Sequence, residues 1–301
     1  MSEEVERHQS VKRHQPEEHL MYVVTGATGQ LGRLAVESLL AEVPAAEVAV
    51  AVRSAEKAAD LAARGVSVRV VDYDRPESLA GAFAAGDRVL FISGSEVGRR
   101  LPQHQAVVEA AKAAGVALLA YTSIQGAATF ALADEHRATE AMILASGLPY
   151  VFLRNGWYTE NYLGDVAGTV ERGIVLGSAG EGRVATAPRG DYAEAAVAAL
   201  TGDATNETYE LSGDTAWSLG ELAAELAQAS GRPVEHRNVA PAEHLAALVG
   251  AGLPEGFAGA LVDVDAGIAR GELAGTPGDL ARLIGRPTVP LAESVRAAVG
   301  A

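Results

Sequence analysis

The segment Thr25–Gly32 reads TGATGQLG and stands between an apolar run, Leu20–Val24, and a stretch with helical periodicity. Its glycines therefore fall at a predicted turn from a strand into a helix. A dinucleotide-binding turn needs glycine for a positive φ angle, for close approach of a diphosphate, and for tight packing of helix on strand. The N–H groups that open the helix also attract an anion. The predicted dinucleotide contacts at this turn are Gly26, Ala27, Thr28, Gly29, Gln30, Leu31 and Gly32.

From Met21 to Asn155 the sequence alternates short apolar runs with segments of helical periodicity. This alternation predicts an α/β fold, a doubly wound parallel sheet of the Rossmann type. The predicted strands are Tyr22–Thr25, Val48–Arg53, Val66–Asp72, Arg88–Ser93, Val116–Ser123 and Tyr150–Asn155. The helices expected after the first one are Pro76–Ala85, Pro102–Ala114 and Asp134–Ala145.

The pattern changes beyond Gly156. We expect short strands at Gly173–Leu176 and Thr208–Leu211, and a helix at Asp191–Leu200 between them. Ser218 and Glu221 form a capping box before another helix. The sequence thus predicts a nucleotide-binding Rossmann domain at residues 21–155 and a smaller C-terminal α/β lobe, for substrate, at residues 156–301. As an alternative, part of that lobe, at about 186–204, packs back on the first domain.

Composition excludes several classes of function. The net charge of −15 argues against a nucleic-acid partner and against binding to an anionic membrane face. The absence of cysteine excludes disulfides and thiolate chemistry, and we predict no metal site. No apolar run approaches the length of a membrane span, and no signal peptide is visible, so we expect a cytoplasmic protein. Residues 1–20, with His8, His14 and His19, are expected to be a disordered extension, with metal binding as the alternative.

The end of the second predicted strand indicates which dinucleotide binds. NAD-binding Rossmann domains carry an acidic residue there, whereas this chain has Arg53, which can pair with a 2′-phosphate. We therefore predict NADPH, with Lys57 either a second phosphate contact or a solvated side chain. Asp72, at the end of the third strand, either meets the adenine edge or caps the next turn.

Small residues follow the fourth and fifth predicted strands. Ser93, Gly94 and Ser95 let a ribose and nicotinamide lie against the backbone, unless this segment is only an ordinary turn. Ser123 ends the fifth strand and is the predicted hydroxyl contact to the nicotinamide ribose.

The absence of one catalytic motif limits the reactions that this protein could catalyse. Short-chain dehydrogenases that reduce carbonyls use a Tyr-x-x-x-Lys pair, in which lysine lowers the tyrosine pKa. None of the eight tyrosines has lysine four residues later. A quinone still accepts hydride without that pair, because aromatisation drives the step and the hydroquinone oxygens need little general-acid help.

The residues after the sixth predicted strand are candidates for a slot that binds a flat acceptor. Asn155 offers an amide to nicotinamide or to a quinone oxygen, and Tyr158 offers a flat face with a hydroxyl. His136 is either a proton donor or a hydrogen-bonded structural residue. The candidate catalytic residues are thus His136, Asn155 and Tyr158. The further expected contacts to cofactor are Trp157, Asn161 and Tyr162, with an aromatic core between the two domains as the alternative for Trp157.

Several longer motifs resemble one family. They are TGATGQLG, Ser95–Gly98 (SEVG), Ala120–Ser123 (AYTS), Ala133–His136 (ADEH), Leu153–Leu163 (LRNGWYTENYL), Gly213–Leu219 (GDTAWSL) and Leu283–Thr288 (LIGRPT). Together they resemble the bacterial type-2 NAD(P)H:quinone oxidoreductases, which are atypical short-chain dehydrogenase/reductases of the NmrA-like group. The likeness runs from Met21 to about Val299.

The resemblance implies a Rossmann domain with a small C-terminal lobe, NADPH as cofactor, and reduction of a quinone without flavin. It carries cofactor contact onto Gly26–Gly32, Arg53, Ser93–Ser95 and Trp157–Tyr162. The alternative within the same group is a non-catalytic regulatory protein that senses NADP(H) and signals through a partner protein. A homodimer is a further option that the sequence leaves open.

Overall fold

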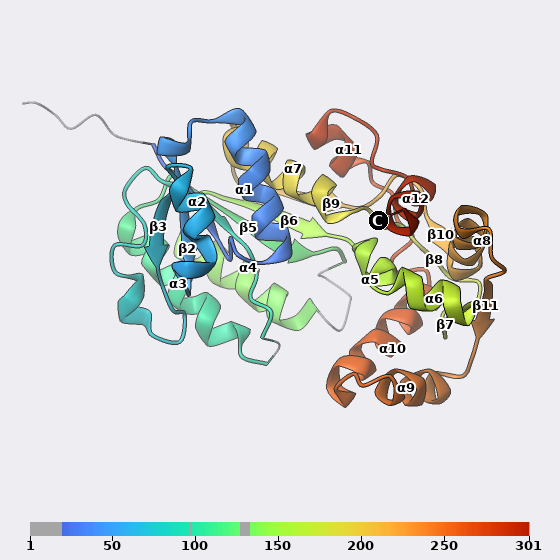
Figure 1. The fold of residues 1–301 in the computed structure, drawn as a ribbon. Helices are drawn as coiled ribbons and strands as arrows, with labels where there is room; N and C mark the ends of the chain where they lie inside the picture. Colours follow the sequence, from blue (N-terminus) through green and yellow to red (C-terminus); the bar gives the residue numbers. More distant parts are fainter. Residues whose placement is uncertain (1–19, 97, 127–132, 301) are drawn as a thin grey trace, which may run out of the picture.

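The computed structural model describes residues 20–96, 98–126 and 133–300, so the predicted extension with its three histidines lies outside the described residues apart from Leu20. Its main sheet has seven parallel strands in the order β3-β2-β1-β4-β5-β6-β9 (Figure 1). These strands are β1 Tyr22–Thr25, β2 Val48–Val52, β3 Ser67–Val70, β4 Arg88–Phe91, β5 Leu118–Ile124, β6 Tyr150–Asn155 and β9 Glu207–Leu211. The predicted doubly wound Rossmann fold is confirmed.

Helices cover both faces of this sheet (Figure 1). One face packs against α1 Gln30–Glu42, α2 Ala59–Ala63, α7 Arg189–Thr201 and α11 Asp279–Ile284. The other face packs against α3 Arg100–Ala114 and α4 Asp134–Ser146. Strand β2 (VAVAV) is buried along its whole length, as expected for a central parallel strand with helices on both sides.

The smaller lobe holds two short ribbons and a set of helices. Strand β7 Ile174–Gly177 pairs in parallel with β11 Glu235–Asn238, and β8 Arg183–Val184 pairs antiparallel with β10 Trp217–Ser218. The helices around them are α5 Glu160–Leu163, α6 Val166–Arg172, α8 Leu219–Ser230, α9 Pro241–Gly250, α10 Glu255–Ala269 and α12 Leu291–Val299. The capping box at Ser218 and Glu221 is present as predicted and starts α8.

Two predictions need correction. The segment around Thr208–Leu211, assigned to the smaller lobe, forms β9 and extends the main sheet beside β6. An alternating pattern identifies a strand but does not say which sheet it joins. The helix expected at Pro76–Ala85 is only a 3₁₀ turn, η3 Pro76–Leu79. The backbone becomes extended at Ala80, with ψ of 117°, and Gly81 follows with a φ of +78°, so the helix does not continue.

Two further 3₁₀ turns, η1 Ala45–Glu47 and η2 Glu56–Ala58, link elements at the sheet edge. In the described part of the chain, no helix combines the length and the apolar character that crossing a membrane requires.

Candidate active site

The glycine turn between β1 and α1 uses each glycine for a different reason. Gly26 has a φ of +59°, which side chains other than glycine rarely adopt. A Cβ on Gly32 would lie 2.3 Å from the Gly26 carbonyl oxygen, so the helix packs on the turn only because this position has no side chain. Gly29 is the N-cap of α1 and makes no side-chain cap. The first N–H groups of α1 therefore remain available to an anion.

A cavity of about 530 Å³ opens beside this turn, at the carboxyl ends of β1, β2 and β4. This is the edge where ligands bind in open α/β sheets. It collects most of the residues that the sequence predicts for the cofactor. Those that line it are Gly26, Thr28, Gly29, Gln30, Leu31, Gly32, Arg53, Lys57, Asp72, Ser93, Gly94, Ser95 and Tyr158. Ala27, by contrast, is fully buried beneath the turn.

A pair of cations stands at one end of the cavity. Arg53 follows β2, its side chain is 72% exposed, and Lys57 lines the wall nearby. Arg53 Nη1 lies 3.1 Å from Glu96 Oε1, and Glu96 also pairs with Arg99 at 3.0 Å. An exposed ion pair of this kind is worth about 0–1 kcal/mol, so a phosphate group can replace Glu96 as the partner of Arg53 at small cost. The cation pair therefore fits a 2′-phosphate.

Asp72 caps the turn that follows β3. Its carboxylate accepts hydrogen bonds from the Asp74 backbone N–H and from Arg75 Nε, both at 3.1 Å. The Asp74 bond, and after it Arg75, holds the pKa of Asp72 below its usual value. Both proposed roles remain compatible, because the carboxylate caps the turn while the residue also lines the cavity.

The segment that follows β4 is held by three side chains in succession. The Ile92 N–H donates to Thr25 Oγ1 at 3.0 Å, and the Ser93 N–H donates to Thr122 Oγ1 at 2.9 Å. The Gly94 N–H donates to His104 Nε2 at 3.0 Å. Side chains thus replace the sheet partners that these N–H groups lose as the chain leaves β4. The result is a fixed backbone wall on the cavity.

The fold itself would accept a side chain at Gly94, since the neighbours of an added Cβ lie at ordinary contact distance. A Cβ there would lie 3.4 Å from His104 Nε2 and 3.5 Å from Gln103 Oε1. Arg100 Nε donates to the Gly94 carbonyl at 2.6 Å from the same helix, α3. Helix α3 therefore holds both backbone polar groups of Gly94, its N–H and its carbonyl.

The hydrogen bonds behind this wall fix the protonation state of His104. Thr139 Oγ1 donates to the Glu135 carbonyl, so His104 Nδ1 must donate to Thr139 Oγ1 across 2.8 Å. His104 Nε2 is then the acceptor that Gly94 requires. Burial, and secondarily the charge of Arg100, lowers the pKa of His104 to about 4. His104 is therefore neutral near neutral pH.

His136 lies in the same hydrogen-bond network and lines none of the three cavities described in this section. It is 6% exposed; its Nδ1 lies 2.9 Å from Tyr121 Oη and its Nε2 lies 3.3 Å from Arg100 Nη1. Burial first, then Arg100 and His104, lowers its pKa to about 3. A neutral, enclosed imidazole matches the structural alternative rather than a proton donor in contact with substrate.

Ser123 is engaged elsewhere in the fold. Its hydroxyl donates to Glu140 Oε1 at 2.6 Å, and Glu140 pairs with Arg154 at 2.7 Å. Arg154 also reaches Glu210 at 2.8 Å. This network joins β5, α4, β6 and β9. Ser123 is 5% exposed and is not among the residues that line the cavity.

Asn155 and Tyr158 form a pair at the end of β6. Asn155 Nδ2 donates to Tyr158 Oη at 3.2 Å, while Asn155 Oδ1 is buried without a partner in the described part of the chain. The Arg189 guanidinium stacks 4.5 Å from the centre of the Tyr158 ring. Burial raises the pKa of Tyr158, so its hydroxyl keeps its proton. Asn155 is not among the residues that line the cavity, but its unsatisfied oxygen stands next to Tyr158, which does line it, and fits an amide N–H of a ligand such as nicotinamide.

The remaining aromatic candidates face a second cavity. Trp157, Asn161 and Tyr162 line a space of about 580 Å³ in the smaller lobe, whereas Tyr158 lines the dinucleotide cavity. The segment after β6 thus contributes residues to two different cavities.

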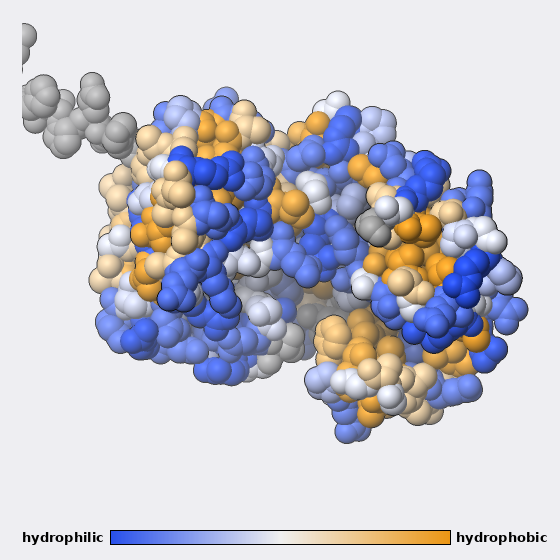
Figure 2. Space-filling view, in the orientation of Figure 1, coloured by the Kyte–Doolittle hydropathy of each residue, from blue (hydrophilic) through white to orange (hydrophobic). Residues whose placement is uncertain are grey.

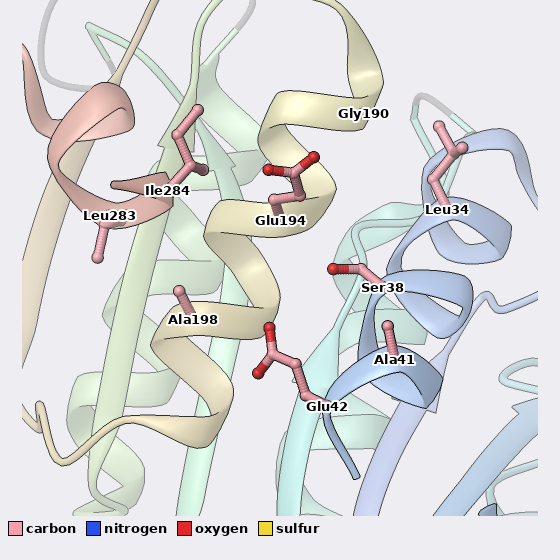
Figure 3. Close-up of a pocket in the computed structure, with 9 residues that line it drawn as sticks. All are labelled: Leu34, Ser38, Ala41, Glu42, Gly190, Glu194, Ala198, Leu283 and Ile284. Carbon is pink, nitrogen blue, oxygen red and sulfur yellow. The ribbon is translucent and has the colours of Figure 1, made fainter. Parts of the chain in front are cut away.

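A third hollow lies on the outer helices α1, α7 and α11 (Figure 3). Glu42 and Glu194 project into it, so it disfavours a phosphate, and none of the residues that line it is a predicted site residue.

Sequence reasoning missed the residues that support the wall of the cavity. Arg100 and Gln103 line the cavity from the first turn of α3, and Thr25, Thr122 and His104 hold the segment after β4. Polar residues at the ends of buried strands, and a basic residue in the first turn of the helix after β4, were the available signals. The other cavity-lining residues not predicted include Tyr73, Asp74, Ile92 and Glu96.

The Rossmann sheet, its glycine turn and the cation pair after β2 define a dinucleotide-binding protein. The chain belongs to the NAD(P)H-binding family, whose profile matches residues 26–203. It is 48% identical over 279 residues to quinone oxidoreductase 2 of Escherichia coli K12, covering 91% of this chain and 97% of that protein. It is 32% identical to an NAD(P)H azoreductase of Xenophilus azovorans, covering 92% of this chain and 97% of the other.

Solved structures agree. The crystal structure of the NADPH-dependent quinone oxidoreductase QOR2 of Escherichia coli with NADPH superposes with a TM-score of 0.89 at 47% identity, covering 92% of this chain and 99% of that one. A triphenylmethane reductase of Citrobacter sp. in complex with NADP(H) superposes with a TM-score of 0.88 at 42% identity, covering 92% and 99%. The predicted relationship to bacterial quinone oxidoreductases is confirmed.

Proposed function

We propose that this protein is an NADPH-dependent oxidoreductase that transfers hydride to a quinone without a flavin. The observation that carries the proposal is the cavity on the glycine turn, with Arg53 and Lys57 at one end and Tyr158 among its other lining residues. It occurs in a chain 48% identical to quinone oxidoreductase 2. The related proteins named above are reductases, which favours catalysis over a regulatory sensor of NADP(H).

The dinucleotide fits the residues present. The first N–H groups of α1 would hold its diphosphate, and Arg53 with Lys57 would hold the 2′-phosphate. The wall formed by Ser93–Ser95 would support the nicotinamide half, and Asn155 Oδ1, which has no partner among the described residues, would accept from the carboxamide. When bound, NADPH supplies the hydride from its nicotinamide ring.

The protein orients the reacting groups and provides little acid–base chemistry. Tyr158 keeps its proton and receives the Asn155 amide on its oxygen, so its O–H can donate to an oxygen of the acceptor. The Arg189 guanidinium lies over the Tyr158 ring, and its positive charge stabilises negative charge that develops on the acceptor oxygen during reduction. These roles match an acceptor whose reduction is driven by aromatisation, because no strong general acid is required.

The decisive experiment mixes purified protein with NADPH and benzoquinone and follows the absorbance of the reduced cofactor. We expect turnover well above the rate without protein, and the same rate after flavin has been removed from the sample by dialysis. Tight NADPH binding with no turnover for any quinone tested would instead support the alternative, a non-catalytic regulatory protein that senses NADP(H). The names of the azoreductase and the triphenylmethane reductase make azo and triphenylmethane dyes useful second acceptors.

Two further points belong to this proposal. A homodimer is the option left open by the sequence, and light scattering of the purified protein decides between it and a monomer. We also expect the protein in the cytoplasm, which fractionation of the source cells tests.

A further inference from the structure

The second cavity, of about 580 Å³, lies within the smaller lobe and is separate from the dinucleotide cavity. The two cavities have no lining residue in common. The wall at Ser93–Ser95 and the hydroxyl of Tyr158, where the proposed reaction takes place, both belong to the dinucleotide cavity. A molecule bound in the smaller lobe therefore does not touch the residues that serve hydride transfer, and this cavity suits a ligand other than the acceptor.

The body of this cavity is apolar. Aliphatic side chains from β7, α8 and α10 form much of its wall, among them Val175, Leu222, Leu226 and Leu261, and Trp157 adds an aromatic ring. Figure 2 shows that apolar residues also gather on the surface over α9 and α10, the helices that border the cavity. A cavity of this size and lining is typical of a site for a small molecule with an apolar body.

One cation of the wall has no close partner. Arg237, on β11, lines the cavity, and its guanidinium makes no hydrogen bond with the described residues; its ion pair with Glu235 spans 3.9 Å. The other arginine of the wall, Arg172, is already paired with Asp165 at 3.1 Å. A single guanidinium balances a single negative charge and offers two parallel N–H groups, so Arg237 fits a carboxylate.

A buried hydroxyl of the wall also lacks a partner. Tyr162 lines the cavity, and its Oη is buried and has no hydrogen-bond partner among the described residues. Burial first, and then the charge of Asp265, raises the pKa of Tyr162, so this hydroxyl keeps its proton. An unpaired buried donor is costly, so a ligand oxygen that accepts from Tyr162 would stabilise the complex.

His244 supplies an acceptor beside the same aspartate. Its Nδ1 lies 3.1 Å from Asp265 Oδ2, and the Ser178 hydroxyl donates to that oxygen at 3.2 Å. Because a carboxylate only accepts, Nδ1 carries the proton, and Nε2 of the neutral imidazole is left as an acceptor. One ligand hydroxyl meets both needs, since it can accept from Tyr162 and donate to His244.

The exposure of these groups orients the ligand. The Arg237 side chain is 55% exposed and that of His244 is 8% exposed, so the cation stands at the mouth of the cavity and the histidine inside it. We propose that this cavity is a second ligand site, which binds an apolar carboxylate with its acid group at Arg237 and its hydrocarbon body among the aliphatic side chains. A hydroxyl on that body pairs with Tyr162 and His244.

Intrinsic fluorescence measures this binding directly. The chain has two tryptophans, and both report on the cavity, because Trp157 lines it and the Trp217 ring centre lies 5.1 Å from that of Tyr162. The protein without NADPH is titrated with decanoate, ω-hydroxydecanoate and decanol, so the result does not depend on the proposed reaction. We expect saturable binding of decanoate, binding of ω-hydroxydecanoate at least threefold tighter, and binding of decanol at least tenfold weaker.

Two variants that remove the same charge test the anchor. Arg237→Gln removes the cation that lines the cavity, whereas Arg232→Gln removes an exposed cation of the same lobe that does not line it. We expect R237Q to weaken decanoate binding at least tenfold and to leave decanol binding within twofold. R232Q should change neither affinity by more than twofold. Equal affinity for decanoate in R237Q and wild type would overturn the proposal.

A second pair of variants, on α9, locates the ligand. Ala247 is exposed and lines the cavity, so Ala247→Phe fills it, whereas Ala246→Phe adds the same ring to an exposed neighbour that does not line it. We expect A247F to lose decanoate binding and A246F to keep it. In turnover with benzoquinone, decanoate should leave the KM for quinone and the KM for NADPH within twofold. Competition of decanoate with either substrate would make this cavity part of the catalytic site and would reject a separate ligand.

Discussion

The Gly94 N–H donates to His104 Nε2 at 3.0 Å, so the wall of the dinucleotide cavity depends on a histidine that lacks a proton on that nitrogen. Protonation of His104 turns this acceptor into a donor and sets two N–H groups against each other. The bond thus joins the protonation state of a residue inside α3 to the shape of the cofactor site.

This relationship predicts acid sensitivity. The pKa of His104 is about 4 in the fold against 6.5 ordinarily, so the unfolded chain binds more protons between those pH values. Stability should therefore fall as the pH drops from about 6.5 to about 4, by about 3 kcal/mol from this residue. Urea unfolding at a series of pH values measures the slope. His136, with a pKa of about 3, adds to the same trend.

His104→Gln is the informative variant, because its amide can still face Gly94 but does not titrate in this range. We expect a flatter dependence of the unfolding free energy on pH than in wild type. If the unfolding free energies of the two proteins changed in parallel with pH, His104 would not be the source of the acid sensitivity.

The glycine turn predicts two unequal effects from the same substitution. Gly32→Ala places a Cβ 2.3 Å from the Gly26 carbonyl oxygen, whereas Gly29→Ala leaves 3.3 Å to the same atom. Because backbone cannot yield as a side chain does, G32A should lose about 1–3 kcal/mol of stability and most NADPH binding. G29A should keep the fold and lose less stability and less NADPH binding than G32A. Thermal unfolding with and without NADPH compares them, and equal losses would contradict this account of the turn.

The pair Arg53–Glu96 predicts cofactor selectivity. Arg53→Gln should weaken NADPH binding about tenfold or more and leave NADH almost unchanged, since a charge-assisted hydrogen bond is worth about 1.5–3 kcal/mol. Glu96→Gln removes the competing partner, 3.1 Å away, and should strengthen NADPH a few-fold at most. Direct titration with each dinucleotide tests both variants. An equal loss for NADPH and NADH in R53Q would mean that the 2′-phosphate binds elsewhere.

The sequence predicted the sheet and most of the dinucleotide cavity because these depend on local patterns. Each of these features is recognised from a few consecutive residues. Examples are the buried apolar run of a strand, the glycine turn at Gly26, and Arg53 at the end of the next strand. Strand partners are not local, so β9 was placed in the wrong lobe although its existence was predicted.

The roles of single polar residues were harder to predict, for a physical reason. Ser123 and His136 stand at the expected ends of elements, but each is bonded to a partner from another element, Glu140 and Arg100 respectively. A hydroxyl or imidazole near a site points toward a ligand only if no buried group inside the protein claims it first. That competition is decided by tertiary packing, which spacing along the chain does not reveal.

The Asn155–Tyr158 pair gives the last prediction. Tyr158→Phe removes the O–H offered to the acceptor and leaves Asn155 Nδ2, now 3.2 Å from Tyr158 Oη, without that partner. Because one neutral hydrogen bond is worth about 1 kcal/mol, kcat with benzoquinone should fall about fivefold. NADPH binding should change little, since the phosphate contacts are untouched. Tyr150→Phe is the matched control, because Tyr150 stands on β6, the strand that leads to Tyr158, and lines neither the dinucleotide cavity nor the cavity of the smaller lobe. Steady-state kinetics at fixed NADPH measures the effect. A loss of several hundredfold in Y158F would instead make Tyr158 an essential proton donor, and no loss would remove it from the mechanism.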